Sequence, residues 1–298
     1  MRFLARTAAA FSILAIASLF VPGGAQAAKP DEKLKVGITK NFFQNFSETI
    51  ARLVMQPFPE VVKAQTGLPG EIAMSPDSTE LCERMKKGDA HLGVFQGHEF
   101  FWASRKYPEL KPLMLAVNEK TPLKAYLIAR KSDSNKPISE MAGKTLAIPT
   151  QTRPFARLWV ERRAVLPGKA LHEHYAKVFP IGDSEEALDN VREGSLDLVL
   201  VEKASWDRYK RIKPSANETL SPILESETFP STVIAYFPKS VQNSYVERFR
   251  KGMMTADQNP GSARLLQLVK ISSFQPVPND FMKEGESLIQ AYPPANPR

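Results

Sequence analysis

The sequence contains a single cysteine, Cys82, among its 298 residues. An internal disulfide is therefore excluded, and packing alone must hold the folded chain together. Cys82 lies within residues 79–85, a stretch with the composition of a helix. We interpret it as a small buried hydrophobic side chain and not as a reactive thiol.

The sequence also lacks the short motifs that mark common catalytic sites. It has no Gly-x-Ser-x-Gly elbow, no Walker phosphate-binding loop and no His-Glu-x-x-His. Its four histidines and Cys82 show no zinc-binding spacing, and His172 and His174 would diverge on a helix. We therefore expect no metal, no cofactor and no enzymatic activity. An enzyme hypothesis would have to use His98 and Glu99 as an acid–base pair, without an activated nucleophile.

The excess of charge of one sign is small. The formal net charge is +8, and residues 1–27 contribute two arginines and no acid, which leaves +8 − 2 = +6 for the remainder. Basic residues are scattered among acidic ones, and no basic run with interleaved aromatics occurs, so nucleic-acid binding is not expected. A mild positive field would help to attract an anionic solute over a short range.

Long hydrophobic runs are confined to the N-terminus. A basic start with Arg2 and Arg6 precedes an apolar run over residues 8–21, and Ala25-Gln26-Ala27 supplies a cleavage pattern. The run is short for a membrane span. We expect a signal peptide cleaved near residue 27, no lipid anchor, and a soluble protein in the periplasm.

Strands alternate with helices along the remaining chain. Apolar patterns predict strands over residues 34–38, 71–74, 88–95, 124–130, 144–149, 196–201 and 233–237, and helices over 46–62, 97–107, 138–143, 150–165, 184–192, 244–254 and 262–269, with a further helix beginning near residues 75–80. This alternation predicts an α/β fold with a parallel-rich sheet.

One pattern occurs twice with the same order of parts. A helix, a glycine turn and an apolar strand follow one another over residues 84–95 and again over 190–201. The second strand, 196–201, is apolar enough to be buried on both faces. Two similar α/β lobes, one in each half, are the natural interpretation.

Several segments, in order, carry a resemblance to a known family. They are the first strand at 34–38, the helix–Gly–strand element ending at Phe95, the strand 126–130 with Lys131-Ser132-Asp133-Ser134, the helix–Gly–Lys step over 138–147, and Ile271-Ser272-Ser273-Phe274-Gln275-Pro276-Val277 near the end. In this order over about 240 residues, the chain resembles the periplasmic phosphate/phosphite/phosphonate-binding proteins of ABC importers.

The resemblance implies a type II periplasmic binding protein, with two lobes that close on a ligand. It implies lobe 1 over 33–119 plus 228–298, lobe 2 over 120–227, and two crossings that form the hinge. The function it implies is capture of a small oxyanion, such as a phosphonate or phosphate, for an ABC permease in the inner membrane, by a monomer. A sensory or accessory protein that meets another partner is the alternative.

Candidate ligand-binding residues follow from the same resemblance. The second-lobe turn that grips a phosphonate in the family corresponds here to Thr150-Gln151-Thr152-Arg153, followed by Pro154, and the acidic residue after the buried strand corresponds to Glu202. Arg153 could pair with an oxyanion, and Pro154 suits the first turn of a helix. The other candidates are Lys40, Asn41, Asp77, Ser78, His98, Glu99 and Tyr126.

Some of these positions depart from the family pattern. Pro76-Asp77-Ser78 stands where the family has Thr-Asp-Tyr, and Glu99-Phe100 stands where it has Ser-Tyr. Unpaired carboxylates of Glu99 and Glu202 would oppose an anion. They either bridge the lobes through salt bridges or contact a ligand that also carries an amine.

Overall fold

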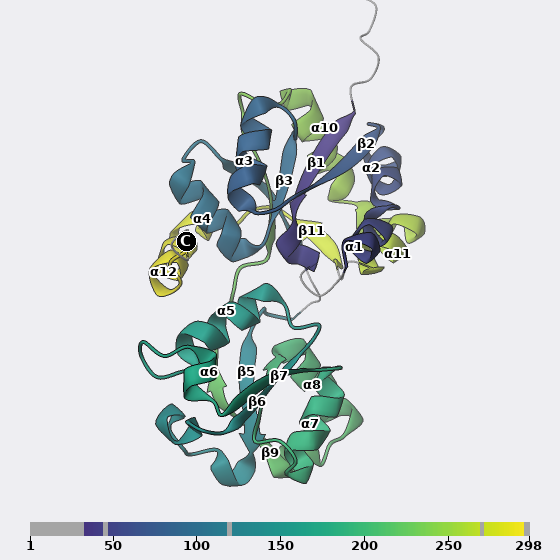
Figure 1. Cartoon of the computed structure of the whole chain (residues 1–298). Coiled ribbons are helices and arrows are strands. Elements are labelled where there is room, and N and C mark those ends of the chain that lie inside the picture. Colours follow the sequence, from purple (N-terminus) through teal and green to yellow (C-terminus); the bar gives the residue numbers. More distant parts are fainter. Residues whose placement is uncertain (1–32, 44–46, 118–120, 269–270, 295–298) are drawn as a thin grey trace, which may run out of the picture. The chain divides into compact units, whose positions relative to one another are not determined.

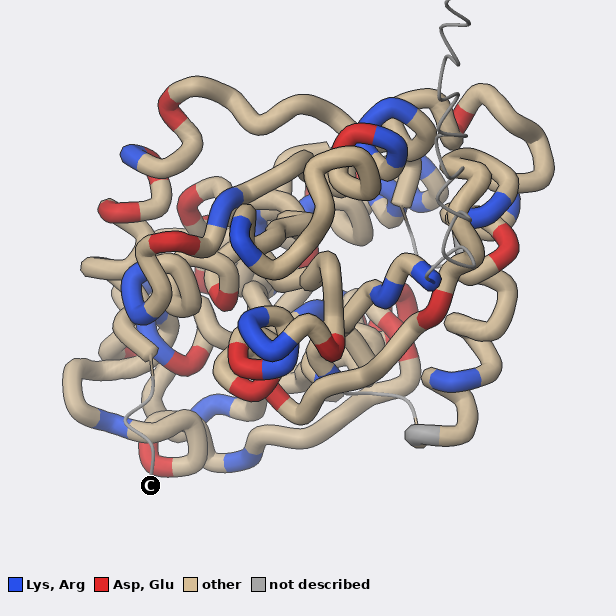
Figure 2. Tube along the Cα trace, turned by 90° about the horizontal axis from the view of Figure 1, so that it is seen from above, with Lys and Arg blue, Asp and Glu red and all other residues tan. Residues whose placement is uncertain are grey.

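The computed structural model describes residues 33–43, 47–117, 121–268 and 271–294 (Figure 1). The predicted signal peptide, residues 1–27, lies outside the described residues. Within the described ranges, no helix combines the length and apolar character needed to cross a bilayer. Basic and acidic residues are interspersed along the trace (Figure 2).

The first sheet is mixed and has the strand order β11-β4-β10-β3-β1-β2. Strand β1 is parallel to both of its neighbours, β2 and β3, whereas β10 is antiparallel to β3 and β4. The strands are β1 (Leu34–Thr39), β2 (Gly70–Ser75), β3 (Leu92–Phe95), β4 (Lys111–Val117), β10 (Thr232–Tyr236) and β11 (Ser273–Gln275). Residues before 118 and after 231 thus build one sheet together.

The second sheet is also mixed and has the order β7-β6-β8-β5-β9. Here β6 is parallel to β7 and β8, and β5 is antiparallel to β8 and β9. The strands are β5 (Ala125–Arg130), β6 (Thr145–Pro149), β7 (Lys177–Ile181), β8 (Leu198–Glu202) and β9 (Leu220–Glu225). Both sheets therefore consist of three parallel strands joined to antiparallel ones.

Helices flank both sheets. The α-helices are α1 (Glu48–Met55), α2 (Phe58–Thr66), α3 (Ser78–Lys87), α4 (Gly97–Lys106), α5 (Pro154–Arg163), α6 (Leu171–His174), α7 (Ser184–Glu193), α8 (Lys203–Ile212), α9 (Ala216–Thr219), α10 (Asn243–Met253), α11 (Pro260–Leu268) and α12 (Phe281–Ala291). The 3₁₀ helices are η1 (Lys40–Phe43), η2 (Lys131–Asp133), η3 (Ile138–Met141) and η4 (Ala256–Gln258). This architecture confirms the predicted α/β fold class, and in both units the sheet is mixed.

Alternation of side chains along the strands explains why both faces need helices. In β10, Ile234 belongs to the core formed with α2 and α10, whereas its neighbours Val233 and Ala235 belong to the core formed with α3, α4 and α12. Successive residues of a strand point to opposite faces. A strand that is apolar at every position is therefore covered on both sides.

The repeated pattern takes the same form in each sheet. Helix α3 ends at Gly88 and leads into β3, and α7 ends at Gly194 and leads into β8. Both glycines are left-handed, with φ of 80° and 86°, as this helix ending requires. The strands β3 and β8 then take equivalent places next to β1 and β6, which confirms the interpretation of two similar α/β units.

Two expected helices have different limits in the structure. The expected helix over 46–62 is two helices, because Pro57 cannot continue α1 and instead precedes α2. The expected helix over 150–165 begins only at Pro154, as α5. Residues 150–153 are consequently a loop between β6 and α5, which matters for the site described below.

The apolar patterns did not indicate four strands, β4, β7, β9 and β11, and the first three of these contain a proline. Pro180 and Pro222 lie in β7 and β9, the two edges of the second sheet. Pro112 lies near the start of β4, where the pairing with β10 shifts register. Proline cannot donate a ladder hydrogen bond, so it is confined to such edges and irregular places.

Helix α10 packs against α2 through Gly252. A Cβ atom on Gly252 would lie 2.2 Å from the backbone oxygen of Gln65. Replacing an internal helical glycine by alanine would otherwise stabilise a helix by about 1 kcal/mol. We expect Gly252→Ala to destabilise the protein by about 1–3 kcal/mol instead, because the overpacking outweighs the gain in helix propensity.

Urea denaturation would measure this change. Lys251→Ala, at the exposed neighbouring position, is the matched control and should stay within about 0.5 kcal/mol of the wild type. An increase in stability for Gly252→Ala would show that α2 and α10 do not pack closely at this point.

Candidate functional site

The β6–α5 loop, residues 150–153, is held in a defined conformation. The Thr150 backbone amide donates to Ile181 O (2.9 Å), and its hydroxyl donates to Gly182 O (2.9 Å). The Thr152 amide donates to Pro149 O (3.0 Å), and the Thr152 side chain is buried. The loop ends at Pro154, the first residue of α5, where a missing amide hydrogen costs nothing. Gln151, Thr152 and Arg153 are thus presented at the N-terminus of a helix.

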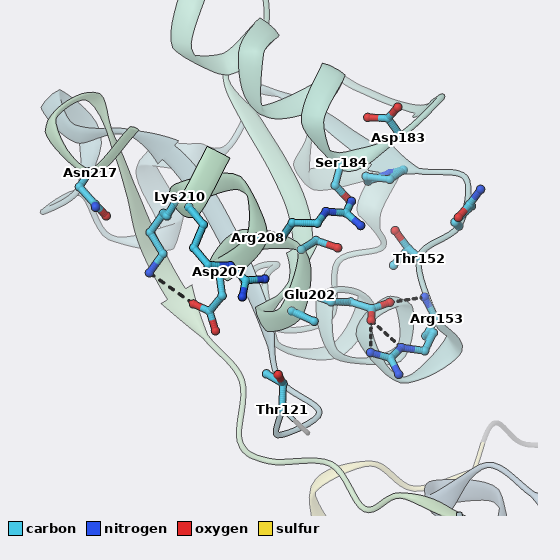
Figure 3. Close-up of a pocket in the computed structure, with 15 residues that line it drawn as sticks. Thr121, Thr152, Arg153, Asp183, Ser184, Glu202, Asp207, Arg208, Lys210 and Asn217 are labelled. Carbon is cyan, nitrogen blue, oxygen red and sulfur yellow. Dashed lines mark hydrogen bonds and ion pairs between the residues drawn. The ribbon is translucent and has the colours of Figure 1, made fainter. Parts of the chain in front are cut away.

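Glu202 fixes the orientation of Arg153. The Arg153 amide donates to Glu202 Oε1 (2.8 Å), and its guanidinium forms a salt bridge with Oε2 (Figure 3). Glu202 ends β8, which lies parallel to β6, so the carboxyl ends of these strands meet at one edge. Among the described residues, Arg153 Nη1 is buried and has no hydrogen-bond partner. A buried donor without a partner is uncommon in folded proteins.

A polar cavity of about 730 Å³ lies beside this loop (Figure 3). The loop and Glu202 form part of its wall, and α8 contributes most of the rest. The residues that line it are Thr121, Pro149, Gln151, Thr152, Arg153, Asp183, Ser184, Glu202, Ala204, Ser205, Asp207, Arg208, Lys210, Arg211 and Asn217. Some of its cations are paired with acids, such as Lys210 with Asp207 (3.4 Å).

Polar residues also gather at the carboxyl ends of β1 and β3 in the first sheet. Glu99, which is 2% exposed, accepts hydrogen bonds from the Thr39 hydroxyl (3.0 Å), the Asn41 side-chain amide and the Gln96 backbone amide (3.3 Å). Burial raises the pKa of Glu99, and these three donors oppose the shift. Glu99 therefore holds Asn41 and Gln96 in place while its own acceptors are used within the protein.

A second cavity, of about 190 Å³, is lined by hydrogen-bond donors from the β6–α5 loop and from the polar residues around Glu99. Asn41, Gln96, Gln151, Thr152 and Arg153 line it. Most of the remaining wall is hydrocarbon, contributed by strands of the first sheet and by the helices α1, α2 and α10. The β6–α5 loop is common to the two cavities.

The structure thus brings five of the predicted residues to these cavities, namely Asn41, Gln151, Thr152, Arg153 and Glu202. Other predicted residues line neither of the two. Asp77 is exposed and caps α3 by accepting from the Glu80 amide (2.9 Å), with Ser78 as the first helical residue. Lys40 is exposed, and Tyr126 is a core residue of the second sheet.

The two acidic candidates pair locally. Glu202 pairs with Arg153 from the adjacent strand end, and Glu99 bonds to Thr39, Asn41 and Gln96. In each case these residues come from the strands of one sheet and from the segments that directly follow them. These contacts do not include the salt bridges between lobes that were expected as one role for Glu99 and Glu202.

Sequence reasoning missed several residues of the polar cavity. Asp183 and Ser184 begin α7, and Arg208 lies on α8. The repeated helix–glycine–strand pattern could have indicated Asp183. Asp183 caps α7 by accepting from two amides, as Asp77 caps α3 in the earlier copy.

Comparison with known proteins assigns the family. Residues 42–281 match the model described as ABC transporter, phosphonate, periplasmic substrate-binding protein. The chain belongs to this family of periplasmic substrate-binding proteins. No curated protein sequence shows significant similarity to the chain.

Solved structures show that the fold is shared with other binding proteins. A Xanthomonas citri protein bound to ATP is 15% identical, with a TM-score of 0.59 over 87% of this chain and 96% of that one. A binding component of an ABC phosphonate transporter from Pseudomonas aeruginosa is 13% identical, with a TM-score of 0.55 over 88% and 87%. PhnD1 from Prochlorococcus marinus, in complex with methylphosphonate, is 13% identical, with a TM-score of 0.57 over 88% and 98%. These matches confirm the two-lobed periplasmic binding-protein fold.

His98, a predicted ligand donor, is buried in α4, with its ring edge to face against Trp102 at 4.9 Å between centroids. Burial lowers the pKa of His98 from 6.5 to about 4. The unfolded chain therefore binds a proton below about pH 6.5 that the folded protein excludes until about pH 4. The folded protein is therefore destabilised relative to the unfolded chain as the pH falls from about 6.5 to about 4.

We expect the wild type to lose roughly 2 kcal/mol more stability than His98→Gln between about pH 7.5 and about pH 5. Urea unfolding of both proteins at the two pH values measures the difference. His172→Gln, at an exposed position, should show the wild-type loss. Equal losses for the wild type and His98→Gln would mean that His98 is protonated in the folded protein.

Proposed function

We propose that this periplasmic substrate-binding protein captures a small organic anion at the β6–α5 loop and delivers it to an ABC permease, without changing it chemically. Membership of the family supports the transport role. The observation that supports an anionic ligand concerns Arg153, whose guanidinium is oriented by Glu202 and whose buried Nη1 has no partner in the part of the chain that the structure describes. An oxygen of a phosphonate, sulfonate or carboxylate would supply the missing acceptor.

The surroundings of Arg153 favour an anion. The loop stands at the N-terminus of α5, where the helix dipole is positive. The wall of the adjoining polar cavity holds other cations, but Arg208 pairs with Glu185 (3.2 Å) and Lys210 with Asp207 (3.4 Å). Binding would therefore depend mainly on Arg153 and on the helix N-terminus.

The proposal includes closure of two lobes, residues 33–119 with 228–298 and residues 120–227. The two segments that would cross between them pair with each other, since the Phe229 amide donates to Leu123 O (2.8 Å) in an isolated antiparallel bridge. Nearby, the Ala125 amide donates to the Ser226 hydroxyl (2.8 Å). Paired connections of this kind suit a hinge, whose equilibrium a ligand in the cleft would shift towards the closed state.

We further propose how the protein is exported and how it meets the permease. The N-terminal segment would direct export and be removed near residue 27. The mature protein would act as a monomer and present its closed form to the permease. Mass spectrometry of the molecule that co-purifies with native protein would identify the ligand.

Arg153→Gln tests the proposed function. Loss of a charge-assisted hydrogen bond should weaken anion binding by about 10- to 100-fold. Isothermal titration calorimetry would measure this with methylphosphonate, butylphosphonate, butanesulfonate and butyrate, starting with those that raise the melting temperature of the wild type.

Arg162→Gln is the matched control, because Arg162 is exposed near the other end of the same helix. It should retain wild-type affinity. The proposed function would be refuted if none of the four acids binds to folded wild-type protein, or if Arg153→Gln binds as tightly as Arg162→Gln.

A further inference from the structure

The cavity of about 190 Å³ has a wall that is mainly hydrocarbon. Val36 and Ile38 of β1, Phe58 of α2, Phe249 of α10 and Phe274 of β11 all contribute to it. A space lined largely by apolar side chains favours an apolar occupant, since water there would find few hydrogen-bond partners.

The apolar part of this wall is unsuited to a bare oxyanion. A phosphonate or sulfonate group has oxygens on every side, and each oxygen placed against hydrocarbon would lose its hydrogen bonds to water. The hydrogen-bond donors that line the cavity lie in the segments that follow the carboxyl ends of strands. Asn41 and Gln96 follow β1 and β3, and residues 151–153 follow β6.

The cavity wall is polar at residues 151–153 and apolar along the strands, which suits a ligand with an acidic group and a hydrocarbon group. Its acidic group would lie at residues 151–153, where Arg153 Nη1 lacks an acceptor. Its other part would lie against the strands and against α2 and α10. A cavity of roughly 150 Å³ is sufficient for benzene, so a phenyl group or a short alkyl chain fits the available space.

Resting on the proposed function, we infer that the physiological ligand is an amphiphilic organic anion, an acid that carries a phenyl-sized hydrocarbon group. Methylphosphonate, the ligand in the Prochlorococcus marinus structure, would leave most of the apolar cavity unfilled. The inference therefore distinguishes this chain from a receptor for the smallest phosphonates.

Affinity should consequently rise with the length of the hydrocarbon part. The test compares methyl-, ethyl-, butyl-, hexyl- and phenylphosphonate by calorimetry on the mature protein, with the matching carboxylates as a second series. Each buried methylene should strengthen binding about three- to fourfold until the cavity is full.

Val54→Trp fills the cavity from α1, where Val54 is half-buried and lines it. This variant should abolish the dependence of affinity on the length of the hydrocarbon part. Leu53→Trp is the matched control, because Leu53 lies on the same helix but is 68% exposed. It should retain the dependence.

The outcomes separate this inference from the proposed function. Equal affinity for short and long acids, or an unchanged length dependence in Val54→Trp, overturns the inference and leaves the proposed function standing. Absence of binding by every acid of both series overturns the proposed function and the inference together.

Discussion

Adjacent parallel strands in a sheet end at the same edge, and the candidate site depends on this constraint. In the second sheet it places Glu202, at the end of β8, beside the loop that follows β6. In the first sheet it places Gln96, after β3, beside Asn41, after β1, with Glu99 between them. Each pair is distant in sequence, and only the parallel pairing makes it adjacent.

The two carboxylates at these edges, buried Glu99 and half-buried Glu202, are compensated in different ways. Glu202 faces an arginine, and the remaining capacity of that guanidinium is left for another acceptor. Glu99 is surrounded by uncharged donors, and burial raises its pKa. Because each acid is compensated within its own sheet, neither carboxylate needs the ligand or the opposite lobe as its partner, and an anion can approach the loop.

Much of the fold could be predicted from the sequence because its signals are local. The glycines at 88 and 194 end helices in left-handed conformations, and the apolar run at 196–201 contains a buried strand. The strands with Pro180 and Pro222 could not be predicted in this way. Their prolines are acceptable only because β7 and β9 are edges, and the position of a strand in a sheet is not a local property.

The same distinction applies to the site. The sequence by itself indicated that Pro154 suits the first turn of a helix, but its apolar pattern extended that helix back to residue 150, and only the structure showed residues 150–153 as a loop. The sequence also determined that Glu202 follows a buried strand. Only the tertiary structure decided that Arg153 pairs with Glu202, that His98 is buried against Trp102, and that an apolar cavity adjoins the loop. These features depend on which distant elements pack together, since burial and charge pairing are set by neighbours in space.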